Sequence, residues 1–396
     1  MKRVLPVIVL SQFFCTSLWF AGNAIISDIV KQFHLEPAYL AHLASAVQSG
    51  FIAGTLIFAV LSISDRFSPS LVFFLSSLVA ALFNLAISFN GINSSWLLLF
   101  RFLTGFFLAG IYPVGMKIAA DYYQQGLGKS LGFLVGALVI GTSFPHLLKS
   151  ITAALPWKWV IFSTSFLSVM GGLAMLLWIP DGPYRKAGQP LNPGAFLKGF
   201  RDKKFRAVSF GYFGHMWELY AFWVFVPVIL TAYKDHYPGA GFNIPFLSFL
   251  IIAAGGVSCV LSGLISQWLG AKKTASIALL ISCACCIISP LLLFNRSEPA
   301  LIVFLFTWSM AVIADSPLFS TLVAQNAPPV SKGASLTIVN CIGFSITIIS
   351  IQLINALRTE DNARYIYMLL AIGPVLGLIA LTRDKDNHPK HPEAVK

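Results

Sequence analysis

Apolar runs of about twenty residues recur along the whole chain, separated by short polar segments. A run of that length can cross a hydrocarbon core of roughly 30 Å as an α-helix. The composition agrees, because 57% of the residues are hydrophobic and only 11% are charged. The sequence therefore predicts an all-α integral membrane protein, and it offers no soluble segment long enough for separate enzymatic activity.

Hydropathy and helix-breaking residues predict twelve spans. They cover 5–28, 42–63, 70–90, 96–119, 129–151, 158–180, 206–232, 245–268, 273–294, 299–323, 334–356 and 364–382. The longest polar interval between spans divides them into an N-terminal six-helix bundle at 1–180, a linker at 181–205, a C-terminal bundle at 206–384 and a polar tail at 385–396. Lys and Arg concentrate in the linker and in the loops predicted to lie on the same side of the membrane. This bias predicts that the linker, the tail and both termini are cytoplasmic.

The net charge of +12 does not indicate nucleic-acid binding, because the charges lie mainly in short loops, where they set membrane topology. The six cysteines lie in or beside apolar runs without metal-ligand spacing, so we expect small packing residues and no metal site. No Gly-x-x-x-x-Gly-Lys-Ser/Thr loop occurs in the sequence. Transport driven by ATP is therefore not expected from this chain, and no cofactor is predicted.

The two predicted halves contain a weak internal repeat. The segment YPVGMKIAADYYQQGLGKSL at 112–131 matches SPLFSTLVAQNAPPVSKGASL at 316–336 in its proline, helix end, polar loop and Gly-x-Ser-Leu opening. Parallel repeats of this kind are typical of transporters, with the solute site at the interface of the halves.

Several motifs resemble those of the major facilitator superfamily. LSISDRFSPS, after the second span, keeps Asp65 and Arg66 of the family's Gly-x-x-x-Asp-Arg/Lys-x-Gly-Arg-Arg loop, but lacks its glycines and terminal arginines. RFLTGFFLAG keeps the Arg-x-x-x-Gly of the fourth span through Arg101 and Gly105. GFLVGALVIGTSFPHLL keeps the small-residue spacing of the exporter fifth span, but not its Gly-Pro-x-x-Gly-Gly ending. Together with GHMWELYAFW, it resembles a bacterial group often labelled nitrate/nitrite- or cyanate-transporter-like.

This resemblance implies a central cavity lined by spans one, two and seven. It implies that Asp65 and Arg66 latch the two halves on the cytoplasmic side. We expect Pro145 and Pro317 to act as hinges, since proline interrupts helix hydrogen bonding. The residues expected to line the cavity are Arg101, Glu218, Phe222, Trp19, Asn23, Gln48 and Trp223.

Charged residues within predicted spans are candidates for a transport pathway. His215 and Glu218 share one face of span seven at i and i+3, so they can touch. One interpretation is a proton-carrying carboxylate tuned by its histidine, and the other is a structural pair that fixes helix packing. The glycines on this face leave room for water, solute or another helix.

Three further embedded charges carry similar alternatives. Arg101 could bind an anion or couple proton movement, or it could bind backbone carbonyls of span one. Asp315, beside Pro317, could serve a gate or cap a broken helix. Lys117 could contact solute, but it is better placed to reach the membrane interface or pair with Asp121. The proton-coupling candidates are therefore Glu218, His215, Asp315 and Arg101.

The sequence predicts a secondary active transporter that moves a small polar or organic solute, with a weak preference for anions, by alternating access coupled to protons. We expect it to work as a monomer in the inner membrane of a bacterium, with solute, protons and lipid as its partners and no nucleic acid. The alternative is a proton-driven efflux antiporter for amphipathic compounds. A membrane-embedded receptor or enzyme is less favoured, because no sensing domain or catalytic cluster is evident.

Overall fold

The computed structural model describes residues 3–36, 38–123, 127–185, 199–328 and 332–383. In this part of the chain, eleven helices are long and apolar enough to cross a membrane. The predicted first span, 5–28, is instead broken into short helices, the longest being Val4–Thr16. The eleven long helices match the predicted spans closely, while the full count of twelve crossings and their orientation stay predictions.

The N-terminal half contains ten helices among its described residues. These are α1 (Val4–Thr16), α2 (Ala21–Ala24), α3 (Ile26–Phe33), α4 (Tyr39–Val60), α5 (Ile63–Arg66), α6 (Pro69–Ala86), α7 (Ser94–Leu108), α8 (Tyr112–Tyr122), α9 (Leu127–Ile151) and α10 (Lys158–Trp178). Asn93 fixes the start of α7, because its side chain accepts a hydrogen bond from the amide of Trp96 at 3.1 Å.

The C-terminal half continues with helices of similar lengths. They are α12 (Lys203–His236), α13 (Ile244–Leu269), α14 (Ala271–Leu292), α15 (Glu298–Ala314), α16 (Ser316–Asn326), α17 (Lys332–Leu357), the 3₁₀ segment η2 (Ile366–Ala371) and α18 (Ile372–Arg383). Asp202 and Asn243 cap α12 and α13 by accepting the amides of Phe205 and Phe246. The predicted tail, 385–396, and most of the linker lie outside the described residues.

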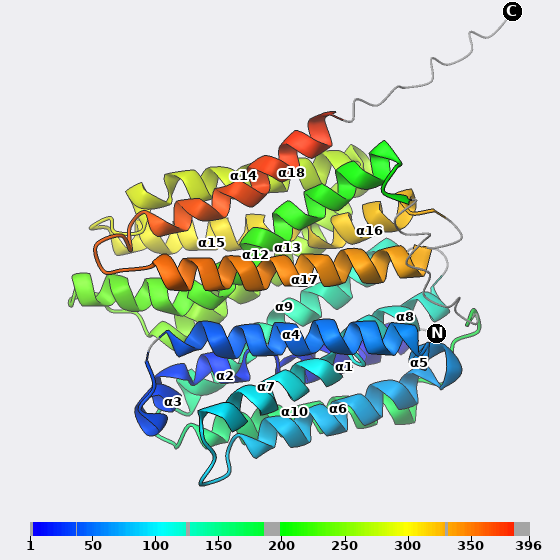
Figure 1. The fold of residues 1–396 in the computed structure, drawn as a ribbon, viewed down its shortest axis with the longest axis horizontal. Coiled ribbons are helices and arrows are strands. Elements are labelled where there is room, and N and C mark those ends of the chain that lie inside the picture. The colour runs from blue at the N-terminus through cyan, green and yellow to red at the C-terminus, as the bar shows by residue number, and fades with distance from the viewer. Residues whose placement is uncertain (1–2, 37, 124–126, 186–198, 329–331, 384–396) are drawn as a thin grey trace, which may run out of the picture.

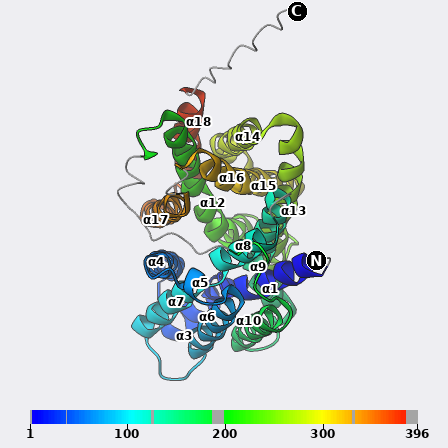
Figure 2. The same cartoon turned by 90° about the vertical axis from the view of Figure 1, so that its right-hand side faces the viewer.

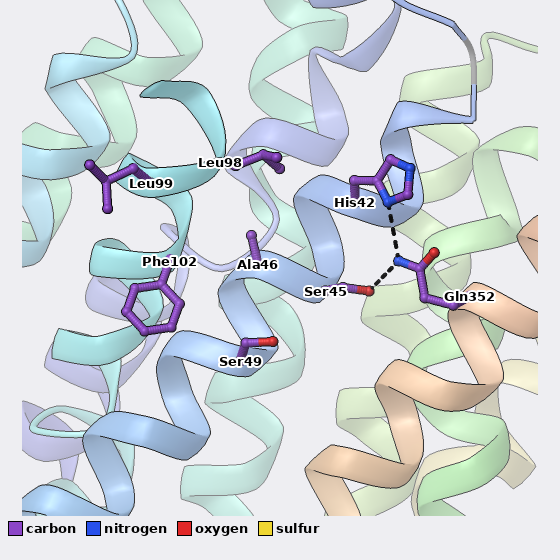
Figure 3. Close-up of a pocket in the computed structure, with 8 residues that line it drawn as sticks. All are labelled: His42, Ser45, Ala46, Ser49, Leu98, Leu99, Phe102 and Gln352. Carbon is purple, nitrogen blue, oxygen red and sulfur yellow. Dashed lines mark hydrogen bonds between the residues drawn. The ribbon is translucent and has the colours of Figure 1, made fainter. Parts of the chain in front are cut away.

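The two halves lie side by side as separate helical groups, α1–α10 coloured from blue to blue-green and α12–α18 from green to red (Figure 1). The end-on view shows the same division (Figure 2). Two seams join them, because α4 packs on α17 and α9 packs on α13. Gln352 of α17 reaches α4 directly at one of these seams (Figure 3). This arrangement places α4, α9, α13 and α17 at the interface of the halves, where α12 also contacts α4.

Glycines allow the closest helix approaches. A side chain at Gly105 of α7 would meet the carbonyl oxygen of Val47 in α4 at 2.1 Å. A side chain at Gly214 of α12 would meet the carbonyl oxygen of Gly373 in α18 at 2.3 Å. Small residues are the usual means of close packing between membrane helices. The glycines near Glu218 therefore accommodate another helix, which was one of the predicted alternatives.

Candidate functional site

The helix is interrupted just before Pro317, between α15 and α16, and the interruption has a local cause, whereas a hinge there stays a prediction. Proline has no backbone N–H, so the carbonyl of Ile313, four residues earlier, loses its usual helical donor. The thiol of Cys259 in α13 lies 3.5 Å from this oxygen and donates to it. Asp315 occupies the junction between α15 and α16, and its carboxylate lies at the N-terminus of α16, where the helix dipole favours negative charge.

His215 of α12 lies against Asp315, with 2.8 Å between Nδ1 and Oδ1. Both side chains are buried, with exposed fractions of 1% and 0%. The contact is close but poorly aligned, since neither ring nitrogen and neither carboxylate oxygen completes a well-directed hydrogen bond. The site therefore joins α12 to the break in α15–α16 through a pair of titratable groups.

Glu218 has different partners from those expected. Its carboxylate accepts hydrogen bonds from Ser282 at 2.9 Å, from the thiol of Cys286 at 3.2 Å and from the indole of Trp308 at 2.6 Å. These donors belong to α14 and α15 of the same half. The predicted contact between His215 and Glu218 is wrong. His215 lies against Asp315, and the carboxylate of Glu218 instead accepts hydrogen bonds from neighbouring helices.

Arg101 lies in α7 with its side chain fully buried, and it binds the broken first span. Its guanidinium donates to the carbonyls of Leu18, at 3.1 Å, and of Trp19. It also donates to Asn84 of α6 at 3.2 Å. Of the alternatives predicted for Arg101, the structure shows the binding of backbone carbonyls in the first span. The guanidinium provides donors for carbonyls that the break between α1 and α2 leaves outside a regular helix.

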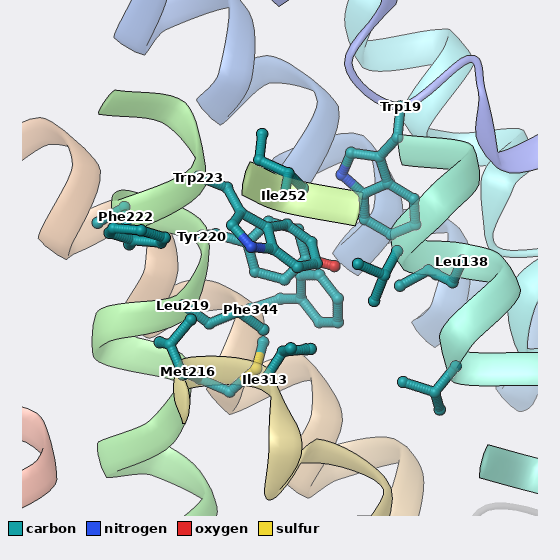
Figure 4. Packing of buried hydrophobic residues seen from close by; sticks show 14 of the residues in the cluster. Trp19, Leu138, Met216, Leu219, Tyr220, Phe222, Trp223, Ile252, Ile313 and Phe344 are labelled. Carbon is teal, nitrogen blue, oxygen red and sulfur yellow. The ribbon is translucent and has the colours of Figure 1, made fainter. Parts of the chain in front are cut away.

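Aromatic side chains from both halves meet at the interface. Trp19 stacks on Tyr220 with ring centroids 5.9 Å apart and planes inclined by 26°. Phe344 of α17 lies 5.8 Å from Trp19 and 5.3 Å from Tyr220. Figure 4 shows Trp19 facing Tyr220, Trp223 and Phe344 across this region. Trp223, whose ring centroid lies 6.3 Å from that of Phe20, completes the contact between the halves.

Several buried polar groups near this interface have no hydrogen-bond partner among the described residues. They are the side-chain amides of Asn23 and Gln48, the indole N–H groups of Trp19 and Trp223, and Nε of Arg101. Buried polar groups are normally satisfied by protein, water or ligand. Trp19 lies just before α2, and the others belong to α2, α4, α7 and α12, which include elements predicted to line the cavity.

The remaining predicted site residues lie elsewhere. Phe222 packs on Trp308 inside the C-terminal half, with ring centroids 4.7 Å apart. Helix α9 continues through Pro145. Asp65 pairs with Lys117 at 2.7 Å within the N-terminal half, so the expected pairing of Lys117 with Asp121 is replaced.

Arg66 is exposed, and the structure gives Asp65 a partner in its own half. Arg185, at the start of the linker, donates to the backbone carbonyl of Asp65 at 3.1 Å. This end of the N-terminal half is therefore held by contacts within that half and to the linker start. A latch between the halves at Asp65 and Arg66 stays a prediction.

Sequence reasoning missed the groups that hold these charges in place. Asn84 bridges the bundle, because its amide nitrogen donates to Thr164 at 3.1 Å and to Ser165 at 2.9 Å. No pattern in the sequence singled out Trp308 or Ser282, since serine and aromatic residues are common in apolar spans. A buried asparagine in a span, such as Asn84, is the feature that could have been noticed.

The two helical halves, their paired seams and the polar groups buried between them define a membrane transporter architecture. The model of the Major Facilitator Superfamily matches residues 8–351. The chain belongs to this superfamily.

Two comparisons specify the likeness further. A segment is 34% identical over 134 residues to the niacin transporter NiaP of Acinetobacter baylyi, covering 31% of this chain and 29% of that protein. The crystal structure of the human organic anion transporter MFSD10 (TETRAN) has the same fold, with a TM-score of 0.75. It is 15% identical, and the alignment covers 96% of this chain and 99% of that one.

Proposed function

We propose that this transporter carries a small organic anion across the inner membrane of a bacterium and couples its movement to protons. The observation that carries the anion assignment is Arg101, a fully buried cation with no carboxylate partner among the described residues. Its Nε also lacks a hydrogen-bond partner. Buried charges are normally paired, so an incoming anion would supply the missing partner.

Uncharged groups support the same class of solute. The indole N–H of Trp19 is a donor without a partner, and the amides of Asn23 and Gln48 add donors that an anion can use. The partial likeness to a niacin transporter points in the same direction, since niacin is a small aromatic carboxylic acid. The stacked rings of Trp19 and Tyr220 offer flat apolar surfaces suited to such a solute.

The proton-coupling candidates remain Glu218, His215, Asp315 and Arg101, and their surroundings favour the pair of His215 and Asp315. Glu218 already accepts three hydrogen bonds from its own half. Asp315 instead stands at the start of α16, and α16 also contacts α9 of the other half. A change in charge at this junction can therefore bias a helix that contacts the other half.

Uptake into proteoliposomes tests the solute class. With an imposed pH gradient, we expect accumulation of radiolabelled nicotinate and little transport of nicotinamide, its uncharged counterpart of similar shape. Empty liposomes provide the background, and a panel of aliphatic and aromatic carboxylates extends the comparison.

Equal transport of nicotinate and nicotinamide would show that negative charge is not selected. Absence of uptake across the carboxylate panel, with gradient-driven movement of an amphipathic cation instead, would favour the efflux antiporter. Either result would overturn the anion proposal while leaving the membership of the superfamily untouched.

A further inference from the structure

The two halves share few polar contacts. None of the four ion pairs of the described residues joins the halves, since two lie in the N-terminal half, one at the start of the linker and one in the C-terminal half. The hydrogen bonds that described residues make between the halves run from α17 to α4. Cys341 contributes a long thiol contact to the carbonyl of Ile52 at 4.0 Å, and the shorter contacts all come from Gln352.

The amide of Gln352 is anchored at two points on α4. Its Nε2 donates to the carbonyl of Ala41 at 3.1 Å and to the hydroxyl of Ser45 at 2.8 Å. Nδ1 of His42 lies 3.5 Å from the same nitrogen (Figure 3). Because a backbone carbonyl can only accept, the contact with Ala41 fixes which end of the amide faces α4.

These contacts lie at one end of the seam. Ala41 and Ser45 belong to the first two turns of α4, and Gln352 lies near the end of α17. The start of the linker is held at the opposite end of α4, where Arg185 donates to the carbonyls of Asp65 and Phe67. Gln352 therefore joins the halves on the side away from the linker.

The other seam is built differently. The Gly-x-Ser-Leu of the internal repeat recurs 205 residues later at the start of α17, and the position 205 residues before Gln352 is Leu147 of α9. Along α9 and α13 the close contact is made by glycines, since a side chain at Gly136 would lie 3.1 Å from the carbonyl oxygen of Gly256. A glycine contact has no directional bond to break, whereas the amide contact does.

We propose that Gln352 is a releasable latch that holds the halves together at the end of the α4–α17 seam remote from the linker. In an alternating-access cycle, that end must open, and the hydrogen bonds to Ala41 and Ser45 must break first. Two ordinary hydrogen bonds bias such an equilibrium by roughly tenfold to a hundredfold. A groove of about 400 Å³ between α4 and α7, with Gln352 among its lining residues, gives the released side chain room to move.

Cysteine accessibility tests the latch without a known solute. Ala44 is a suitable reporter because it is buried in α4 on the face that meets α17. Phe51, seven residues later on the same face, packs on Phe344 of α17 with ring centroids 4.5 Å apart. In an Ala44→Cys background we expect Gln352→Leu to raise the rate of labelling by a membrane-impermeant maleimide about tenfold. Asn355→Leu, a matched loss of an amide on α17, is expected to leave the rate unchanged.

The chain without Ala44→Cys is labelled in parallel to subtract the native cysteines, and thermal unfolding of each variant confirms that it is folded. If Gln352→Leu does not fold, Ser45→Ala removes one of the two acceptors and is expected to raise labelling a few-fold. Unchanged labelling in folded Gln352→Leu or Ser45→Ala would overturn the latch. The result is independent of the proposed solute, because neither substrate nor transport enters the measurement.

Discussion

Asp315→Asn is expected to abolish accumulation driven by a pH gradient while leaving solute exchange intact. A gradient of two pH units stores about 2.7 kcal/mol per proton, enough for ~100-fold accumulation at one proton per solute. Asparagine has nearly the same shape as aspartate but cannot take up and release a proton. The accumulation ratio in proteoliposomes should therefore fall to about one, and counterflow with solute on both sides should continue.

Glu218→Gln provides the comparison that assigns the coupling. Its carboxylate is held by Ser282, Cys286 and Trp308 within one half, so we expect the variant to retain accumulation even if its thermal stability falls. The reverse pattern, with accumulation lost in Glu218→Gln and kept in Asp315→Asn, would move the proton site to Glu218. His215→Gln should resemble Asp315→Asn, since the two side chains lie 2.8 Å apart.

The positions of the helices could be predicted from the sequence because membrane crossing imposes a local constraint. Every span must keep its backbone hydrogen-bonded and its surface apolar, and both requirements leave a pattern in adjacent residues. The break at Asp315 was also predictable, because Pro317 removes a backbone donor at a known distance along the chain. These features depend on neighbours in sequence.

The partners of the buried charges were not predictable in the same way. His215 and Glu218 are close enough on one helix to touch, but Ser282 and Trp308 approach Glu218 from 64 and 90 residues away. The carboxylate of Glu218 binds donors on neighbouring helices rather than His215 on its own helix. Which helix face meets which neighbour is decided by tertiary packing, and a single sequence does not give that arrangement.

The break in the first span shows the same limit. The apolar run through Leu18 and Trp19 looks continuous in sequence, and α12, its counterpart in the other half, is unbroken from Lys203 to His236. Arg101, 83 residues from Leu18, donates to the broken segment. The position 204 residues after Arg101 is Leu305, so the C-terminal half has no guanidinium at the corresponding place. We infer that Arg101 stabilises the break that distinguishes the two halves.

Arg101→Lys should therefore be nearly as damaging as Arg101→Met, because a lysine keeps the charge but cannot direct separate donors to Leu18, Trp19 and Asn84. Unsatisfied buried acceptors cost about 1–3 kcal/mol each, so both variants should lower the thermal unfolding midpoint clearly and lose transport. Leu305→Met, at the corresponding position of the other half, should lower the free energy of unfolding by less than about 1.5 kcal/mol.

Thermal unfolding and nicotinate uptake, measured on the same preparations, separate a role of the charge of Arg101 from a role of its directed hydrogen bonds. A lysine variant with normal stability and transport would mean that Arg101 acts through its charge alone, whereas loss in both variants supports its hold on the first span.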